Sequence, residues 1–69
     1  MRRWDCRKGA YVEVEEIDAF IKDIEEVYDK HGFSIAHEDI HGSFIVGPDS
    51  HRNREWLRCA HISREFEDG

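Results

Sequence analysis

The chain has 69 residues and a mass of 8.2 kDa, and its 16 Asp and Glu residues outnumber 10 Lys and Arg residues, which gives a net charge of −6. This length supports one domain with a small core, and no apolar run approaches the roughly 20 residues of a membrane helix. The basic residues Arg2 and Arg3 are not followed by an apolar stretch like that of a signal peptide, no complete catalytic or cofactor motif is present, and Cys6 and Cys59 form no redox pair. We therefore expect a cytoplasmic protein that is not an enzyme and needs no cofactor.

Residues 1–12 form a basic segment with aromatic side chains. They carry four basic residues against one aspartate, and they also contain Trp4, Tyr11 and Val12. This composition predicts a basic N-terminal arm or an additional strand.

Residues 13–31 hold the strongest secondary-structure signal. Eight acids stand against two lysines there, so this segment carries a charge equal to that of the whole chain. Apolar residues recur at spacings of three and four, which predicts an amphipathic helix that ends at Gly32. Glu25 is expected to lie away from the apolar stripe, whose members are Val14, Ile17, Phe20, Ile21, Ile24, Val27 and Tyr28.

After Gly32 the pattern changes to alternation, which predicts strands over residues 33–37 and 43–46 joined by a hairpin loop over residues 38–42. Ser50 can cap a short second helix that carries Trp56, Leu57 and Ala60. The predicted fold is a small α+β domain, α-β-β-α over residues 13–60, with the antiparallel hairpin packed against two helices. Residues 61–69 are predicted to be a loose C-terminal tail.

Two histidines and two acids lie together at residues 37–41. In an extended chain His37, Asp39 and His41 project from one face, and two imidazoles with one carboxylate can bind zinc or iron. Polar residues are also typical of a hairpin turn, where Asp39 can bond to the backbone. The pattern therefore leaves a metal site as the alternative to a turn that is only structural.

A second alternative is a nucleotide or nucleic-acid site at Arg52 and Trp56, since a cation beside an aromatic ring suits phosphate pairing and base stacking. The net charge of −6 opposes attraction to a polyanion, so nucleic acid is not an expected partner. The basic residues of the N-terminal segment and second helix can instead pair with the acidic helix, within one chain or across a dimer.

The acidic helix offers a binding surface of its own. A row of carboxylates on one helix creates a concentrated negative potential that attracts a basic partner. The residues expected to make this contact are Glu16, Asp23 and Glu26, although a solvated helix face would show the same pattern.

The stretch from residue 31 to residue 46, with its His-Glu-Asp-x-His-Gly string, and the Glu-Trp-Leu of residues 55–57 resemble short uncharacterised proteins of tailed bacteriophages and prophages. The likeness covers about residues 15–60 and excludes the basic N-terminal segment. The resemblance implies a small phage accessory protein in the cytoplasm of an infected bacterium. The expected function is a binding module that modulates or inhibits a bacterial host protein, and a metal- or nucleotide-binding protein is the alternative.

Self-association is a further expectation. The seven-residue apolar stripe, together with Trp4 and Trp56, exceeds what a two-stranded hairpin can cover. We therefore predict a homodimer.

Overall fold

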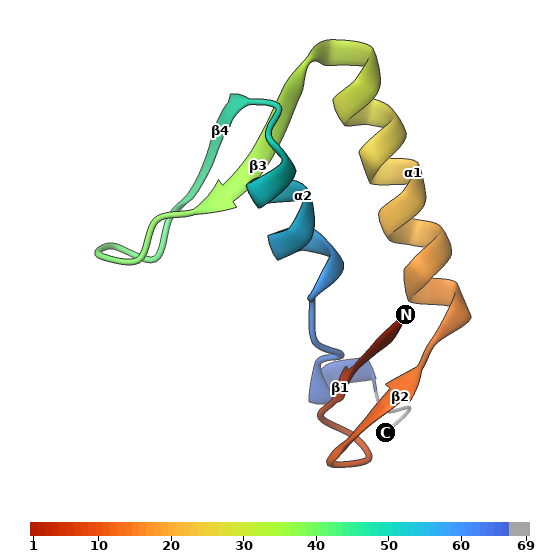
Figure 1. Cartoon of the computed structure of the whole chain (residues 1–69). Helices are drawn as coiled ribbons and strands as arrows, with labels where there is room; N and C mark the ends of the chain where they lie inside the picture. The colour runs from red at the N-terminus through yellow and green to blue at the C-terminus, as the bar shows by residue number, and fades with distance from the viewer. Residues whose placement is uncertain (67–69) are drawn as a thin grey trace.

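The computed structural model describes residues 1–66 and confirms the α+β class and the α-β-β-α order. In Figure 1 the long helix and the second hairpin form two arms joined at the top, and the short helix lies between them. The elements are β1 (Arg2–Asp5), β2 (Ala10–Glu13), α1 (Glu15–His31), β3 (Phe33–His37), β4 (Phe44–Pro48), α2 (His51–Arg58) and the 3-10 helix η1 (Arg64–Phe66).

Helix α1 has a well-defined C-terminal cap but no side-chain cap at its N-terminus. Its N-terminal cap, Val14, makes no side-chain hydrogen bond to the first turn. At the other end Gly32 has a φ of 73° and donates its backbone N–H to the Tyr28 carbonyl over 2.8 Å. Only glycine adopts this left-handed conformation without strain, so Gly32 ends the helix and turns the chain into β3.

Helix α2 packs against β3 through a chain of polar contacts. The Ser50 hydroxyl accepts the Asn53 N–H over 3.1 Å, which confirms the predicted cap. The Asn53 amide in turn donates to the buried Ser34 hydroxyl over 2.9 Å, and that hydroxyl donates to the Pro48 carbonyl over 2.8 Å. These contacts join α2 to both strands of the hairpin.

The N-terminal strand exists, but it does not extend the β3–β4 sheet. Strands β1 and β2 pair with each other in a separate antiparallel sheet. Ile62 lies against β1, where its N–H donates to the Trp4 carbonyl over 2.8 Å and its carbonyl accepts from Cys6 over 3.1 Å.

Ile62 is only 1% exposed, so the prediction of a loose tail from residue 61 is wrong at this position. An isolated isoleucine among polar neighbours gave too weak a signal for burial. Residues 67–69 of the predicted tail lie outside the described residues.

The apolar core is small for a chain of this size. Only Ile21, Tyr28 and Ile62 are buried hydrophobic side chains among the described residues. The radius of gyration is 13.2 Å, whereas a compact domain of this length has about 11 Å. The apolar stripe of α1 is therefore only partly covered, and Phe20 and Val27 remain 61% and 54% exposed. Neither α-helix in the described part of the chain combines the length and hydropathy needed to cross a membrane.

Candidate functional site

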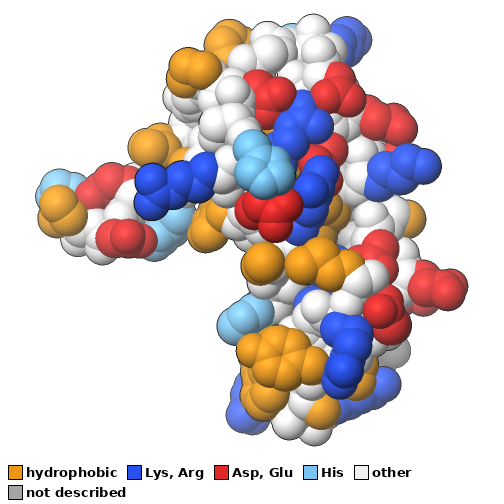
Figure 2. Space-filling view, viewed as in Figure 1, with side chains coloured by type: hydrophobic (Ala, Val, Ile, Leu, Met, Phe, Trp, Pro, Cys, Tyr) orange, Lys and Arg blue, Asp and Glu red, His pale blue; other side chains and the backbone are white. Residues whose placement is uncertain are grey.

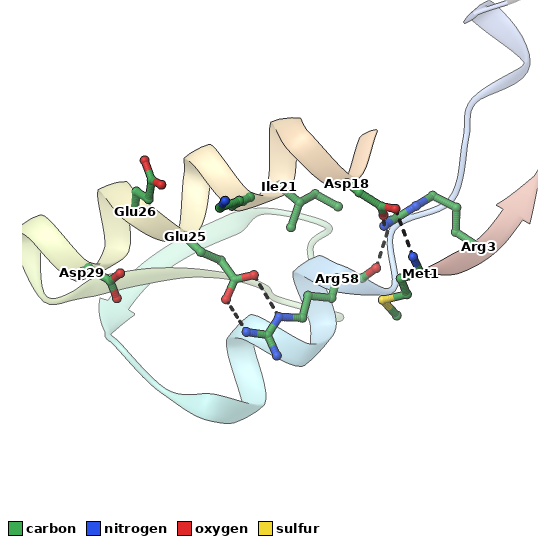
Figure 3. A pocket seen from close by; sticks show the side chains of 9 residues that line it. Met1, Arg3, Asp18, Ile21, Glu25, Glu26, Asp29 and Arg58 are labelled. Atoms are coloured by element: carbon green, nitrogen blue, oxygen red, sulfur yellow. Dashed lines mark hydrogen bonds and ion pairs between the residues drawn. The ribbon is translucent and has the colours of Figure 1, made fainter. Parts of the chain in front are cut away.

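One side of α1 faces α2 and the N-terminal strand, and its acids are paired with arginines. The Arg58 guanidinium donates to both Glu25 carboxylate oxygens over 2.6 and 2.8 Å, as Figure 3 shows. Arg54 donates to Asp29 over 2.6 Å. Figure 2 shows the resulting interleaved red and blue side chains between the two helices. The predicted pairing of basic segments with the acidic helix thus occurs within one chain.

Arg3 makes the corresponding contact at the start of the helix. It is almost fully buried, and its guanidinium donates to the Asp18 carboxylate and to the carbonyls of Arg58 and Ala60, the latter two over 2.9 and 3.2 Å. Its Nε has no hydrogen-bond partner, but these contacts at the two terminal guanidinium nitrogens lower the cost of burying the charge. Arg3 therefore holds together β1, α1 and the end of α2.

These contacts alter the acidity of the carboxyl groups. Hydrogen bonds from Arg58 hold the pKa of Glu25 below its usual range, and those from Arg3 act in the same way on the pKa of Asp18. In β1, hydrogen bonds from Arg7 lower the pKa of the buried Asp5 to about 2. The folded chain therefore stabilises the charged form of all three groups.

The sequence predicts that Glu25 lies away from the apolar stripe, but this does not make it an exposed residue, because Arg58 of α2 bonds to its carboxylate. Its side chain is 13% exposed, and Arg54 also approaches it at 3.5 Å. The apolar stripe and the ion-pairing side of the helix adjoin each other, so a residue just beyond the apolar periodicity can still face a neighbouring helix. Arg54 and Arg58, four positions apart in the sequence, were the available signal for this pairing.

The three predicted contact residues lie outside the ion-paired set of α1. Glu16, Asp23 and Glu26 are exposed, and within residues 1–66 none of them has an ion-pair partner. Glu26 lies at the rim of a groove of about 550 Å³ between α1, α2 and the N-terminal strand. The chain therefore separates its helix acids into a paired inner set and an unpaired outer set.

Exposed apolar side chains accompany the outer acids. Phe20 lies four residues after Glu16 and three before Asp23, and Val27 lies four residues after Asp23. Residues at these spacings are neighbours on a helix surface. The outer face of α1, defined here by Glu16, Phe20, Asp23, Glu26 and Val27, thus combines negative charge with exposed hydrophobic area.

The histidine turn has a different geometry from a metal site. His37 contacts Asp39 through Nδ1 at 3.0 Å, whereas His41 contacts Glu38 at 3.2 Å, so the residues divide into two separate pairs. The Glu38 carboxylate also accepts the backbone N–H groups of Ile40 and His41 over 2.8 and 3.0 Å. No group of three potential metal ligands comes together within residues 1–66. The contacts present are those that stabilise a tight turn.

Arg52 and Trp56 border a recess of about 300 Å³ between α2 and the hairpin. The Trp56 ring is 49% exposed and stacks on His37 with a centroid distance of 6.3 Å. Asp39 lines the same recess. Arg52 could pair with a phosphate there, but the Asp39 carboxylate would repel the same anion.

Comparison with known protein families, curated proteins and solved structures finds no match to this chain.

Proposed function

We propose that this protein is a non-enzymatic binding module that contacts a basic surface of a bacterial host protein through the outer face of α1. The observation that supports this proposal most directly is the unpaired outer set of acids, Glu16, Asp23 and Glu26. The inner acids of the same helix all have arginine partners. Carboxylates without an ion-pair partner in the described part of the chain are available to pair with cations of another molecule.

The apolar side chains of this face add a second source of affinity. Phe20 and Val27 lie among the acids, and burying them on a partner would contribute about 25 cal/mol for each Å² of apolar area removed from water. Charge supplies attraction at a distance, and the hydrophobic contact supplies stability after docking. The phage context proposed for this activity rests on the resemblance of residues 31–46 and 55–57, and modulation of the partner would follow from occupying its basic surface.

The test is affinity capture from a bacterial lysate with quantitative mass spectrometry, using two variants. One variant combines Glu16→Lys, Asp23→Lys and Glu26→Lys, and the other combines His37→Ala, Asp39→Ala and His41→Ala. Circular dichroism must first show that both are folded. We expect the charge reversal to reduce the captured partner at least tenfold, and the turn variant to capture as much as the unmodified chain.

Salt dependence provides an independent readout with the identified partner. The association rate with the unmodified chain should fall as ionic strength rises, because the attraction is electrostatic. If the charge-reversal variant still captures the partner and the turn variant does not, the function belongs to residues 37–41. One zinc or iron per purified chain would support the same alternative. Loss of the captured partner on Arg52→Ala would favour the site at Arg52 and Trp56.

A further inference from the structure

The outer edge of β4 is open, and its side chains are among the most exposed apolar groups of the molecule. Phe44 is 70% exposed, Ile45 49% and Val46 60%. Within residues 1–66, β4 pairs only with β3, and α2 packs beside β3 on the inner side of the hairpin. The hairpin projects from the body of the molecule as an arm, so nothing in the described structure covers this edge (Figure 1).

The backbone groups that point outward can be identified from the register. Glu38 donates to the Ser43 carbonyl over 2.8 Å, and Asp49 donates to the Gly32 carbonyl over 2.9 Å. Hydrogen-bonded pairs alternate along an antiparallel ladder, so the pairs Ser34–Gly47 and Ala36–Ile45 are hydrogen-bonded. Phe44 and Val46 therefore direct their N–H and C=O groups to the open edge.

Pro48 occupies the next outward position along the strand and has no N–H to donate. The open part of the edge is therefore limited to the segment Phe44–Val46. Natural proteins protect exposed strand edges with charged residues, prolines or bulges. The segment from residue 40 to residue 48 contains no Asp, Glu, Lys or Arg, although 38% of the chain is charged. Apart from Pro48 at its end, β4 lacks this protection.

The chain exposes more surface than is typical of a monomer of its mass. The whole chain exposes 5469 Å², whereas a monomer of this mass typically exposes about 4,500 Å². The excess of about 900 Å² is close to the roughly 800 Å² that each partner buries in a standard interface.

We propose that a second copy of this chain covers the edge, with the two β4 strands paired antiparallel about a two-fold axis at Ile45. In this register Phe44 of each copy exchanges hydrogen bonds with the other copy's Val46. The same pairing places an aromatic ring opposite a β-branched side chain, which is a favourable cross-strand contact. The Ile45 side chains of the two copies meet on the other face of the sheet. The product is a continuous four-stranded sheet of order β3-β4-β4-β3.

An uncharged edge suits a second copy better than a charged partner. Each chain carries a charge of −6, so two copies repel each other at a distance, but strands without ionised groups can meet at the contact itself. Added salt screens the long-range repulsion and should strengthen the dimer. This response is opposite in sign to that expected for a basic partner at the outer face of α1, so failure of one proposal leaves the other intact.

Sedimentation equilibrium at micromolar concentration measures the association directly. We expect a mass of twice 8.2 kDa for the unmodified chain, and half of that for Ile45→Lys or Ile45→Glu, because like charges would meet at the two-fold axis. An equimolar mixture of these two variants should regain the dimer mass. Phe20→Lys, which alters a similarly exposed side chain on α1, is the matched control and should remain a dimer.

A cross-linking experiment tests the register even if the charged variants fail to fold. In a non-hydrogen-bonded pair the two Cα atoms lie about 4.5 Å apart, within the range that a disulfide spans. In a chain also carrying Cys6→Ser and Cys59→Ser, Ile45→Cys should therefore form a disulfide-linked dimer on mild oxidation, whereas Phe20→Cys should not. The proposal is overturned by a folded, monomeric unmodified chain, or by a dimer that Phe20→Lys dissociates and Ile45→Lys does not.

Discussion

The β1–β2 hairpin and the β3–β4 hairpin differ in what covers their strands. Buried charged groups hold the first one, since Arg3 bonds to α1 and α2, Asp5 bonds to Arg7, and Ile62 closes the outer side of β1. The second hairpin is attached at β3, through the Ser34–Asn53 hydrogen bond to α2 and the Ile35–Tyr28 hydrogen bond to α1, and its other side exposes Phe44 and Val46. Polar contacts fix position, whereas uncovered apolar area is available for association.

The largest expected loss of stability comes from truncating Ile62, the residue that covers β1 in the first hairpin. Ile62→Ala should lower the free energy of unfolding by about 2–4 kcal/mol, because it removes a fully buried side chain from a core with few members. Such a loss approaches the total stability of a domain this small. Urea denaturation followed by circular dichroism measures it.

Ile40→Ala is the matched control for this change. Ile40 is 85% exposed at the tip of the second hairpin, so its truncation should alter the free energy of unfolding by less than about 0.5 kcal/mol. Equal losses from the two substitutions would show that the two hairpins are not covered differently.

Low pH should destabilise the β1–β2 hairpin and the contacts of α1 with β1 and α2. Arginine contacts lower the folded-state pKa values of Asp5, Asp18 and Glu25, so their contribution is fully present above the unfolded pKa of about 4 and is lost as pH falls toward 2. The urea midpoint should therefore fall between pH 5 and pH 2.5. Asp5→Asn should make this fall shallower, and a midpoint that does not change over the range would contradict the assigned contacts.

Substitutions at two adjacent residues, Glu25 and Glu26, distinguish the ion-paired inner side of α1 from its outer side. Glu25→Lys removes the acceptor of Arg58 and places a third cation beside two guanidinium groups. We expect a loss of about 1–2 kcal/mol, reduced from the value for a buried charged hydrogen bond because Arg58 is partly exposed. Glu26→Lys, one residue further along, should cost less than about 0.5 kcal/mol, and the reverse order would mean that the helix phase is wrong.

The smallest expected effect concerns the attachment of the second hairpin. Ser50→Ala removes the cap of α2 and should cost about 1 kcal/mol, with Ser43→Ala in the hairpin as the control. If hydrogen exchange showed β3 unaffected by Ser50→Ala, the polar contacts of α2 would not be what holds this hairpin in place.

Local patterns predicted the elements well but predicted their partners poorly. The periodicity of residues 13–31, the glycine at 32 and the serine at 50 specify helices and their ends through neighbouring residues alone. The burial of Ile62 against β1 depends on a contact between distant segments, which leaves no periodic trace. At the outer face of α1, the seven-residue stripe predicted that some apolar area would stay uncovered, but its periodicity did not indicate that Phe20 and Val27 would be the exposed members.

The parallel contact between Asp5 and Ile62 also constrains how the protein reaches its native state. Most of the chain separates these residues, so the loop between them must close before their contact contributes stability, and such long-range closure slows folding. During synthesis the N-terminal hairpin cannot complete its contacts until residue 62 has left the ribosome, whereas α1 and the β3–β4 hairpin can form from local segments. The growing chain therefore exposes its uncharged strand before a second copy can pair with it, which makes charge substitutions at Ile45 a means of raising the yield of soluble protein.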